Sequence, residues 1–154
     1  MFKETVAFIR NQFNTPEAFI PLHEPRFVGN EKEYVMDAID STFVSSVGAY
    51  VDKFEEIVSQ KTKAKYVVAT SNGTSALHIG LLMVGVKPGD EVITQPLTFV
   101  ATGNAISYAN AKCVFLDVDR DTMGLSPSAL KIFLEANAEV RNGIAYNKKT
   151  AAKL

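Results

Sequence analysis

A run of small polar residues, TSNGTS at positions 70–75, stands between two apolar segments and has the residue types of an anion-binding turn. A helix that begins near Thr74 leaves its first backbone N–H groups without internal partners, and its dipole puts partial positive charge at that end. Gly73 would let the backbone approach a phosphate closely, while Thr74 and Ser75 would add hydroxyl donors. The same residues would also serve as an ordinary helix cap, so the pattern alone leaves both interpretations open.

Two better-known phosphate-binding patterns are absent from the sequence. It contains no GxxxxGK[ST], and the glycines at 73, 80, 85 and 89 do not form GxGxxG. A net charge of -1 without blocks of like charge argues against a nucleic-acid-binding surface. The only cysteine, Cys113, allows no disulfide within the chain, which favours a reducing compartment such as the cytoplasm.

The sequence also predicts no membrane segment and no signal peptide. The longest uncharged run, residues 66–86, is about long enough to span a bilayer, but it has TSNGTS at its middle. The first 13 residues include Lys3, Glu4 and Arg10 and have no long apolar stretch.

Residues 1–65 are predicted to form an N-terminal helical segment. Apolar residues at 2, 6, 9 and 13 share one face of a short helix. Asn30 and Glu33 are spaced as a capping box that opens a second helix. The segment SSVG at 45–48 breaks that helix, and a third helix is expected from about Tyr50.

From residue 66 to 154 the pattern repeats short apolar strand, small-residue loop and helix. The expected strands are YVVAT (66–70), EVITQ (91–95) and KCVFLDV (112–118), and the helices should begin near Thr74, near Thr98 and after Ser126-Pro127. Apolar strands alternating with helices favour a three-layer α/β fold with a mostly parallel sheet. Ligands of such sheets lie beyond the carboxyl ends of the strands, where TSNGTS and QPLTF fall. The helix after TSNGTS is almost wholly apolar and is expected to be buried.

Three blocks of the sequence resemble the N-terminal part of the DegT/StrS-type sugar aminotransferases. They are GNEKEYVMDAIDSTFVSSVGAYVDKFEE, SNGTSALHIGLL and PGDEVITQPLTFVATGNAISYANAKCVFLDVD. The likeness is greatest to members that aminate a 4-keto nucleotide sugar on the way to legionaminic acid or related bacterial glycans. It implies a cytoplasmic, homodimeric enzyme that uses pyridoxal 5'-phosphate and glutamate. Residues 66–154 would be the first part of an aspartate-aminotransferase-like (PLP fold type I) large domain.

The resemblance also assigns residues of a cofactor site. Gly73, Thr74 and Ser75 match the family's phosphate-binding turn, Phe99 matches the aromatic residue that stacks on the cofactor ring, and Thr102 would lie nearby. We therefore predict that the turn and Phe99 face one pocket. The segment SSVGAY (45–50) matches a loop near the family's active-site entrance, or is simply a turn between helices.

Several residues with reactive side chains receive no functional role. His78 is expected to be a packed histidine, His23 has no evident partner, and Cys113 lies in a strand with nothing to lower its pKa. Asp117 and Asp119 are read as strand-end and turn residues. No metal site is expected.

The catalytic lysine and the acid that protonates the cofactor ring would lie beyond the position that matches Leu154. Lys148, Lys149 and Lys153 belong to a tail that resembles a polar hairpin of the family and do not match the catalytic lysine. The chain is therefore expected to be an N-terminal fragment that is inactive alone. Two alternatives stay open: a sugar dehydratase of the same fold, and a non-catalytic binding or interaction module.

Overall fold

The computed structural model describes residues 2–45 and 47–154. It contains two compact units, one reaching to Val67 and the other spanning Val68–Leu154. The domain boundary expected between residues 65 and 66 stays a prediction.

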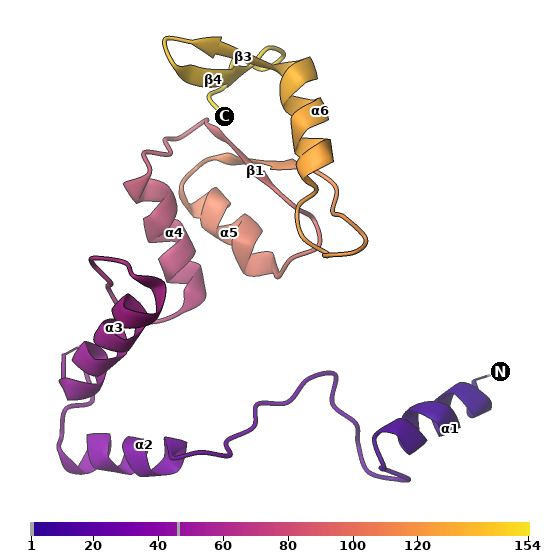
Figure 1. Ribbon diagram of the computed structural model, residues 1–154, viewed down its shortest axis with the longest axis vertical. Helices are drawn as coiled ribbons and strands as arrows, with labels where there is room; N and C mark the ends of the chain where they lie inside the picture. The colour runs from indigo at the N-terminus through magenta and orange to yellow at the C-terminus, as the bar shows by residue number, and fades with distance from the viewer. Residues whose placement is uncertain (1, 46) are drawn as a thin grey trace. The chain divides into compact units, whose positions relative to one another are not determined.

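The first unit contains three helices, which lie where the apolar spacing predicts them. They are α1 (Lys3–Gln12), α2 (Glu31–Asp40) and α3 (Ala49–Thr62), and an extended segment joins α1 to α2 (Figure 1). None of these three helices contains a buried residue. Their apolar faces are therefore exposed in this chain.

The start of α2 differs from the prediction. Asn30 occupies the N-cap position, but its side chain makes no capping hydrogen bond. Instead the carboxylate of Glu31 accepts a 2.9 Å hydrogen bond from the backbone N–H of Gly29. The predicted capping box of Asn30 and Glu33 is therefore wrong, because the Asn30 side chain accepts no backbone N–H of the first turn.

Helices α2 and α3 are linked through Tyr50, whose hydroxyl donates a 2.8 Å hydrogen bond to Asp37 Oδ2. This hydrogen bond to a carboxylate raises the pKa of Tyr50 above its ordinary value. The rings of Tyr50 and Tyr34 also meet at 5.5 Å. Of the segment 45–50, Ser46 lies outside the described residues.

The second unit is built on two parallel strands, β1 (Glu91–Thr94) and β2 (Lys112–Phe115), paired with Glu91 opposite Lys112. Helix α5 (Val100–Tyr108) connects them and packs on β2, and helix α4 (Gly73–Met83) packs on α5 (Figure 1). The buried apolar residues come from α5 and its end: Ala105, Ile106 and Ala109.

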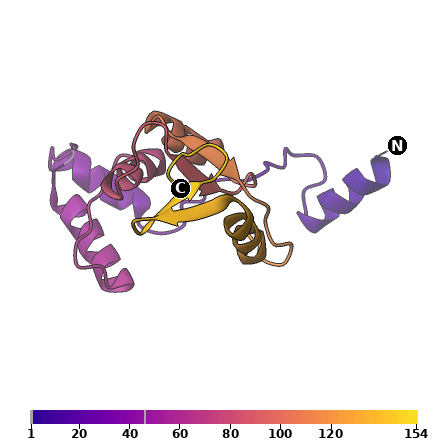
Figure 2. The same ribbon diagram turned by 90° about the horizontal axis from the view of Figure 1, so that it is seen from above.

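After β2, a turn leads into α6 (Pro127–Asn137) and then into an antiparallel hairpin of β3 (Ala138–Arg141) and β4 (Ile144–Asn147) (Figure 2). This confirms the hairpin expected in the tail. The hairpin is joined to β1 by a buried hydrogen bond of 2.8 Å from Asn147 Nδ2 to Glu91 Oε2. The backbone N–H of Glu91 also donates to Lys153 O at 2.7 Å.

The first of the three expected strands does not form. Residues 66–70 are assigned to no strand, and Tyr66 and Val68 are 79% and 80% exposed. A strand requires a neighbour to satisfy its backbone N–H and C=O groups, and among the described residues neither β1 nor β2 pairs with this segment. Its apolar, β-branched composition therefore does not produce a strand in this chain.

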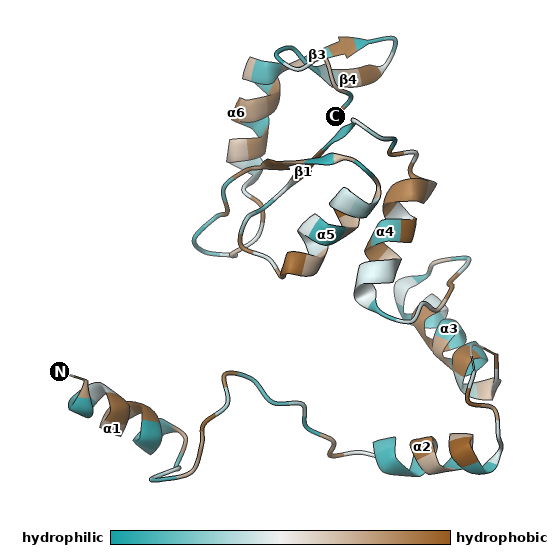
Figure 3. Cartoon of the chain, turned by 180° about the vertical axis from the view of Figure 1, so that it is seen from behind, coloured by the Kyte–Doolittle hydropathy of each residue, from teal (hydrophilic) through white to brown (hydrophobic). Residues whose placement is uncertain are grey.

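The predicted burial of α4 is also wrong. The helix contains no buried residue, and Leu77, Ile79 and Leu82 are about half exposed, at 46%, 50% and 51%. Helix α4 packs on α5, and its apolar residues form much of the helix in the hydropathy colouring (Figure 3). Burying both faces of α4 would require further helices or strands to pack on it, and the described residues do not provide them.

Candidate functional site

The N-terminus of α4 presents backbone donors that no protein group uses. Asn72 is the N-cap, and its Oδ1 accepts the N–H of Ser75 at 2.9 Å. The next amide, of Ala76, donates to Asn72 O at 3.1 Å. Within the described residues, the N–H groups of Gly73 and Thr74 have no acceptor. Two donors at the positive end of the helix dipole are therefore available to an anion.

The side chains around these amides add to the donor set. Thr74 and Ser75 are half-buried, and among the hydrogen bonds of the described residues none uses either hydroxyl. No acidic residue lies in the first turn to repel an anion. The space in front of Gly73 is open, since a Cβ built there would meet nothing within 4 Å. These features fit a phosphate group.

A hollow of about 470 Å³ lies beside this helix end. Its lining residues are Asn72, Thr74, Ser75, His78 and Tyr108. The His78 ring meets the edge of Tyr108 at 5.7 Å and 68°, so α5 closes one side of the hollow. His78 is half-buried in this aromatic contact rather than packed in a core.

Phe99 does not line that hollow, so the predicted shared pocket is wrong for this chain. Phe99 is the N-cap of α5, and its side chain is 79% exposed. Helices α4 and α5 pack on each other, and in Figure 1 both begin at the lower end of the second unit. The structure therefore brings the turn and Phe99 to one end of two packed helices, but not into one cavity. Their assignment to a cofactor stays a prediction.

Thr102 faces the interior rather than the hollow. Its hydroxyl lies 2.9 Å from the hydroxyl of Thr98. It also lines a cavity of about 180 Å³ between α4, β1 and α5, together with residues that include Leu77 and Ile93. In this chain Thr102 therefore holds the start of α5.

Sequence reasoning missed the contribution of Gln95, the residue directly after β1. Its side-chain amide donates to Leu97 O at 2.6 Å and to Met123 O at 3.2 Å. The available signal was a polar residue at the carboxyl end of an apolar strand, which is where ligands of parallel sheets lie. The distant partner, Met123, could not be read from any local pattern.

The other reactive residues lie where the sequence places them. Asp117 Oδ1 accepts from the N–H of Val118 at 2.8 Å, and the N–H of Asp119 donates to Gly124 O, so both belong to the turn after β2. Cys113 is a free thiol within β2. Across the described residues, no helix combines the length and apolarity that a membrane crossing requires.

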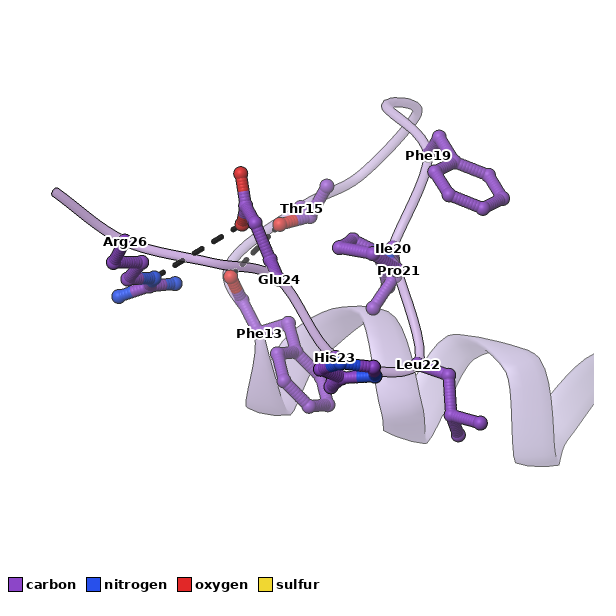
Figure 4. Close-up of a pocket in the computed structure, with 9 residues that line it drawn as sticks. All are labelled: Phe13, Thr15, Phe19, Ile20, Pro21, Leu22, His23, Glu24 and Arg26. Carbon is purple, nitrogen blue, oxygen red and sulfur yellow. Dashed lines mark hydrogen bonds and ion pairs between the residues drawn. The ribbon is translucent and has the colours of Figure 1, made fainter. Parts of the chain in front are cut away.

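A second hollow, of about 270 Å³, lies in the first unit in the loop after α1 (Figure 4). His23 and Phe13 both line it, and Arg26 pairs with Glu24 at 4.0 Å. Both charged side chains are more than half exposed, which makes the pair a weak surface contact. This hollow therefore shows no arrangement that would carry chemistry.

Comparison with known proteins decides the family. The sequence profile of the DegT/DnrJ/EryC1/StrS aminotransferase family matches residues 25–140. The chain belongs to this family. It is 43% identical over 113 residues to GDP-perosamine synthase of Escherichia coli O157:H7, covering 73% of this chain and 31% of that protein. The chain thus spans about a third of the length of the curated relatives it matches.

Solved structures of aminotransferases share the fold. The aminotransferase from Psychrobacter cryohalolentis superposes with a TM-score of 0.65 at 32% identity, over 75% of this chain and 29% of that one. The PLP form of the putative sugar aminotransferase Spr1654 from Streptococcus pneumoniae gives 0.62 at 27% identity, over 75% and 29%. These likenesses confirm the predicted class, a partial α/β domain of the PLP fold type I with parallel strands.

Proposed function

We propose that the chain supplies the phosphate-binding turn and the ring-stacking residue of a pyridoxal 5'-phosphate site. The observation that carries the proposal is the donor set at the α4 N-terminus. It consists of two backbone N–H groups, of Gly73 and Thr74, and two hydroxyls without protein partners. Membership of an aminotransferase family and a structural relative in its PLP form support a phosphate-bearing cofactor as the anion.

Each residue of the proposed site has a physical task. The amides of Gly73 and Thr74 and the hydroxyls of Thr74 and Ser75 would hold the phosphate by charge-assisted hydrogen bonds. The exposed ring of Phe99 would fix the plane of the cofactor ring and exclude water from one face, which contributes about 1 kcal/mol beyond area burial. The bound cofactor supplies the electron sink that amino-group transfer requires.

In the complete protein, we propose that the amino group moves from glutamate to a 4-keto nucleotide sugar for bacterial surface glycan synthesis. The similarity to a GDP-perosamine synthase supports a nucleotide-sugar substrate. We further propose a cytoplasmic homodimer. The 154-residue chain alone should not transaminate, because none of its lysines matches the family's catalytic position; a coupled assay of glutamate consumption would measure this.

Equilibrium dialysis tests the proposed site. Pyridoxamine 5'-phosphate is the suitable probe, because it has no aldehyde and cannot react with surface lysines. We expect it to bind, and pyridoxamine without the phosphate to bind at least about 10-fold more weakly, since hydrogen bonds to a charged group contribute roughly 1.5 to 3 kcal/mol. Equal affinities for the two compounds would contradict the proposal.

A further inference from the structure

Gln95 connects the two loops that follow the carboxyl ends of β1 and β2. It is half-buried, and its side-chain amide has two N–H donors. Both are used: Leu97 O accepts at 2.6 Å and Met123 O at 3.2 Å. One side chain therefore fastens the β1–α5 loop, which carries Phe99, to the turn after β2.

The turn that receives Gln95 is itself well anchored. The N–H of Asp119 donates to Gly124 O at 2.9 Å, and the N–H of Met123 donates back to Asp119 O at 2.8 Å. A bridge between Val118 and Leu125 closes the base of this turn. The carbonyl of Met123 is consequently a fixed acceptor and not the end of a loose loop.

The β1–α5 loop is fastened a second time, next to Phe99. The N–H of Thr98 donates to Pro96 O at 3.0 Å, and the hydroxyls of Thr98 and Thr102 lie 2.9 Å apart. The backbone of Phe99 is thus held on both sides, although its ring is exposed. A ring whose position is fixed before binding loses less conformational entropy when a ligand stacks on it.

We infer that Gln95 is a positioning residue of the proposed cofactor site, which presents the ring of Phe99 to a flat aromatic ligand. This inference rests on the proposed function. Gln95 itself would not contact the ligand, and would act by holding the β1–α5 loop that carries Phe99. Loss of the Gln95 amide should weaken binding of the ring and leave binding of the phosphate alone unchanged.

The test uses a fluorescent side chain at position 99 as the reporter. The chain contains no tryptophan, so Phe99→Trp introduces a single one. Gln95→Met in this reporter chain removes both donors while keeping an unbranched side chain of similar length. The matched control is Gln60→Met, since Gln60 donates only to Glu56 on the exposed surface of α3. Each chain is titrated with pyridoxamine 5'-phosphate, and inorganic phosphate is measured as a competitor.

We expect Gln95→Met to lower the fluorescence anisotropy of the tryptophan and to weaken pyridoxamine 5'-phosphate binding about 3- to 10-fold, the cost of ordering one loose side chain and loop. The inhibition constant of inorganic phosphate should stay within about twofold, because the α4 N-terminus is untouched. Gln60→Met should match the reporter chain in every measurement. If Gln95→Met does not fold, Thr98→Val loosens the same loop and should give the same pattern.

The outcomes separate the inference from the proposed function. Unchanged affinity for pyridoxamine 5'-phosphate overturns the inference, whatever the anisotropy shows. An equal loss of affinity for that ligand and for inorganic phosphate also overturns it, because the effect would then be a general loss of structure. Failure of the reporter chain and the unmodified chain to bind pyridoxamine 5'-phosphate at all would overturn the proposed function, and the inference with it.

Discussion

At the residue scale, the candidate site depends on which polar groups of the α4 N-terminus are already paired. The Asn72 cap uses the Ser75 amide, so the anion is left with the amides of Gly73 and Thr74 and the two hydroxyls. The residue types of this turn could be read from the sequence, because each has an intrinsic preference for a helix start. The sequence could not show which backbone donors the cap uses and which stay available to a ligand, because this depends on the geometry of the turn.

Thr74→Val tests the hydroxyl contribution directly. The substitution keeps the side-chain volume nearly constant and removes one donor to a charged phosphate, a bond that contributes roughly 1.5 to 3 kcal/mol. Affinity for pyridoxamine 5'-phosphate should fall about 10- to 100-fold in a dialysis titration, with unchanged helicity by circular dichroism. The matched control is Thr150→Val, on the exposed turn after β4. Unchanged affinity of the Thr74 variant would exclude Thr74 as a ligand.

At the element scale, the helices were predictable and the sheet was only partly so. The apolar spacing placed α1 and α3 correctly, and Ser126-Pro127 marked the start of α6, because helical hydrogen bonds and caps are local. The segment 66–70 has strand composition but no pairing partner, and pairing depends on distant residues. The hydrogen bond from Gln95 to Met123 was not predictable for the same reason, because its partners lie 28 residues apart in the sequence. The prediction that α4 is buried was wrong for a related reason, because an apolar helix composition does not show which other elements pack on the helix.

The hairpin of β3 and β4 should depend on one buried polar contact with β1. Asn147 and Glu91 are 7% and 6% exposed and share a 2.8 Å hydrogen bond. Asn147→Ala would leave the carboxylate buried without this donor, which should lower the free energy of unfolding by about 1 to 3 kcal/mol in a urea titration. Glu91→Gln retains an acceptor for Asn147 and serves as the control with a smaller effect. Equal stability of the Asn147 variant and the parent chain would contradict this assignment.

At the scale of the whole molecule, many large apolar side chains are exposed in the described chain. Helices α1 to α4 contain no buried residue. Met83 and Val84, at the end of α4, are 80% and 75% exposed. Exposed apolar surface of this extent marks an interface or favours association. The matched region covers only 31% of GDP-perosamine synthase of Escherichia coli O157:H7, which leaves ample further structure in that protein to cover such faces.

We therefore expect the isolated chain to self-associate. Sedimentation velocity should give an average mass above 16.8 kDa that rises with concentration, because apolar helix faces are buried between copies. Met83→Lys should reduce the association, since it places a charge on the exposed end of α4. A single species of 16.8 kDa at every concentration would show that the exposed apolar faces do not cause self-association in solution.

The most direct test of the proposed site is an amide-resolved NMR titration of the chain with pyridoxamine 5'-phosphate. We expect the largest shifts of backbone N–H resonances at Gly73 and Thr74, the two amides that have no acceptor among the described residues, with smaller shifts near Phe99. Inorganic phosphate should shift Gly73 and Thr74 but leave Phe99 unchanged. Saturable shifts centred elsewhere in the chain, with Gly73 and Thr74 unmoved, would contradict the assignment of the α4 N-terminus as the phosphate site.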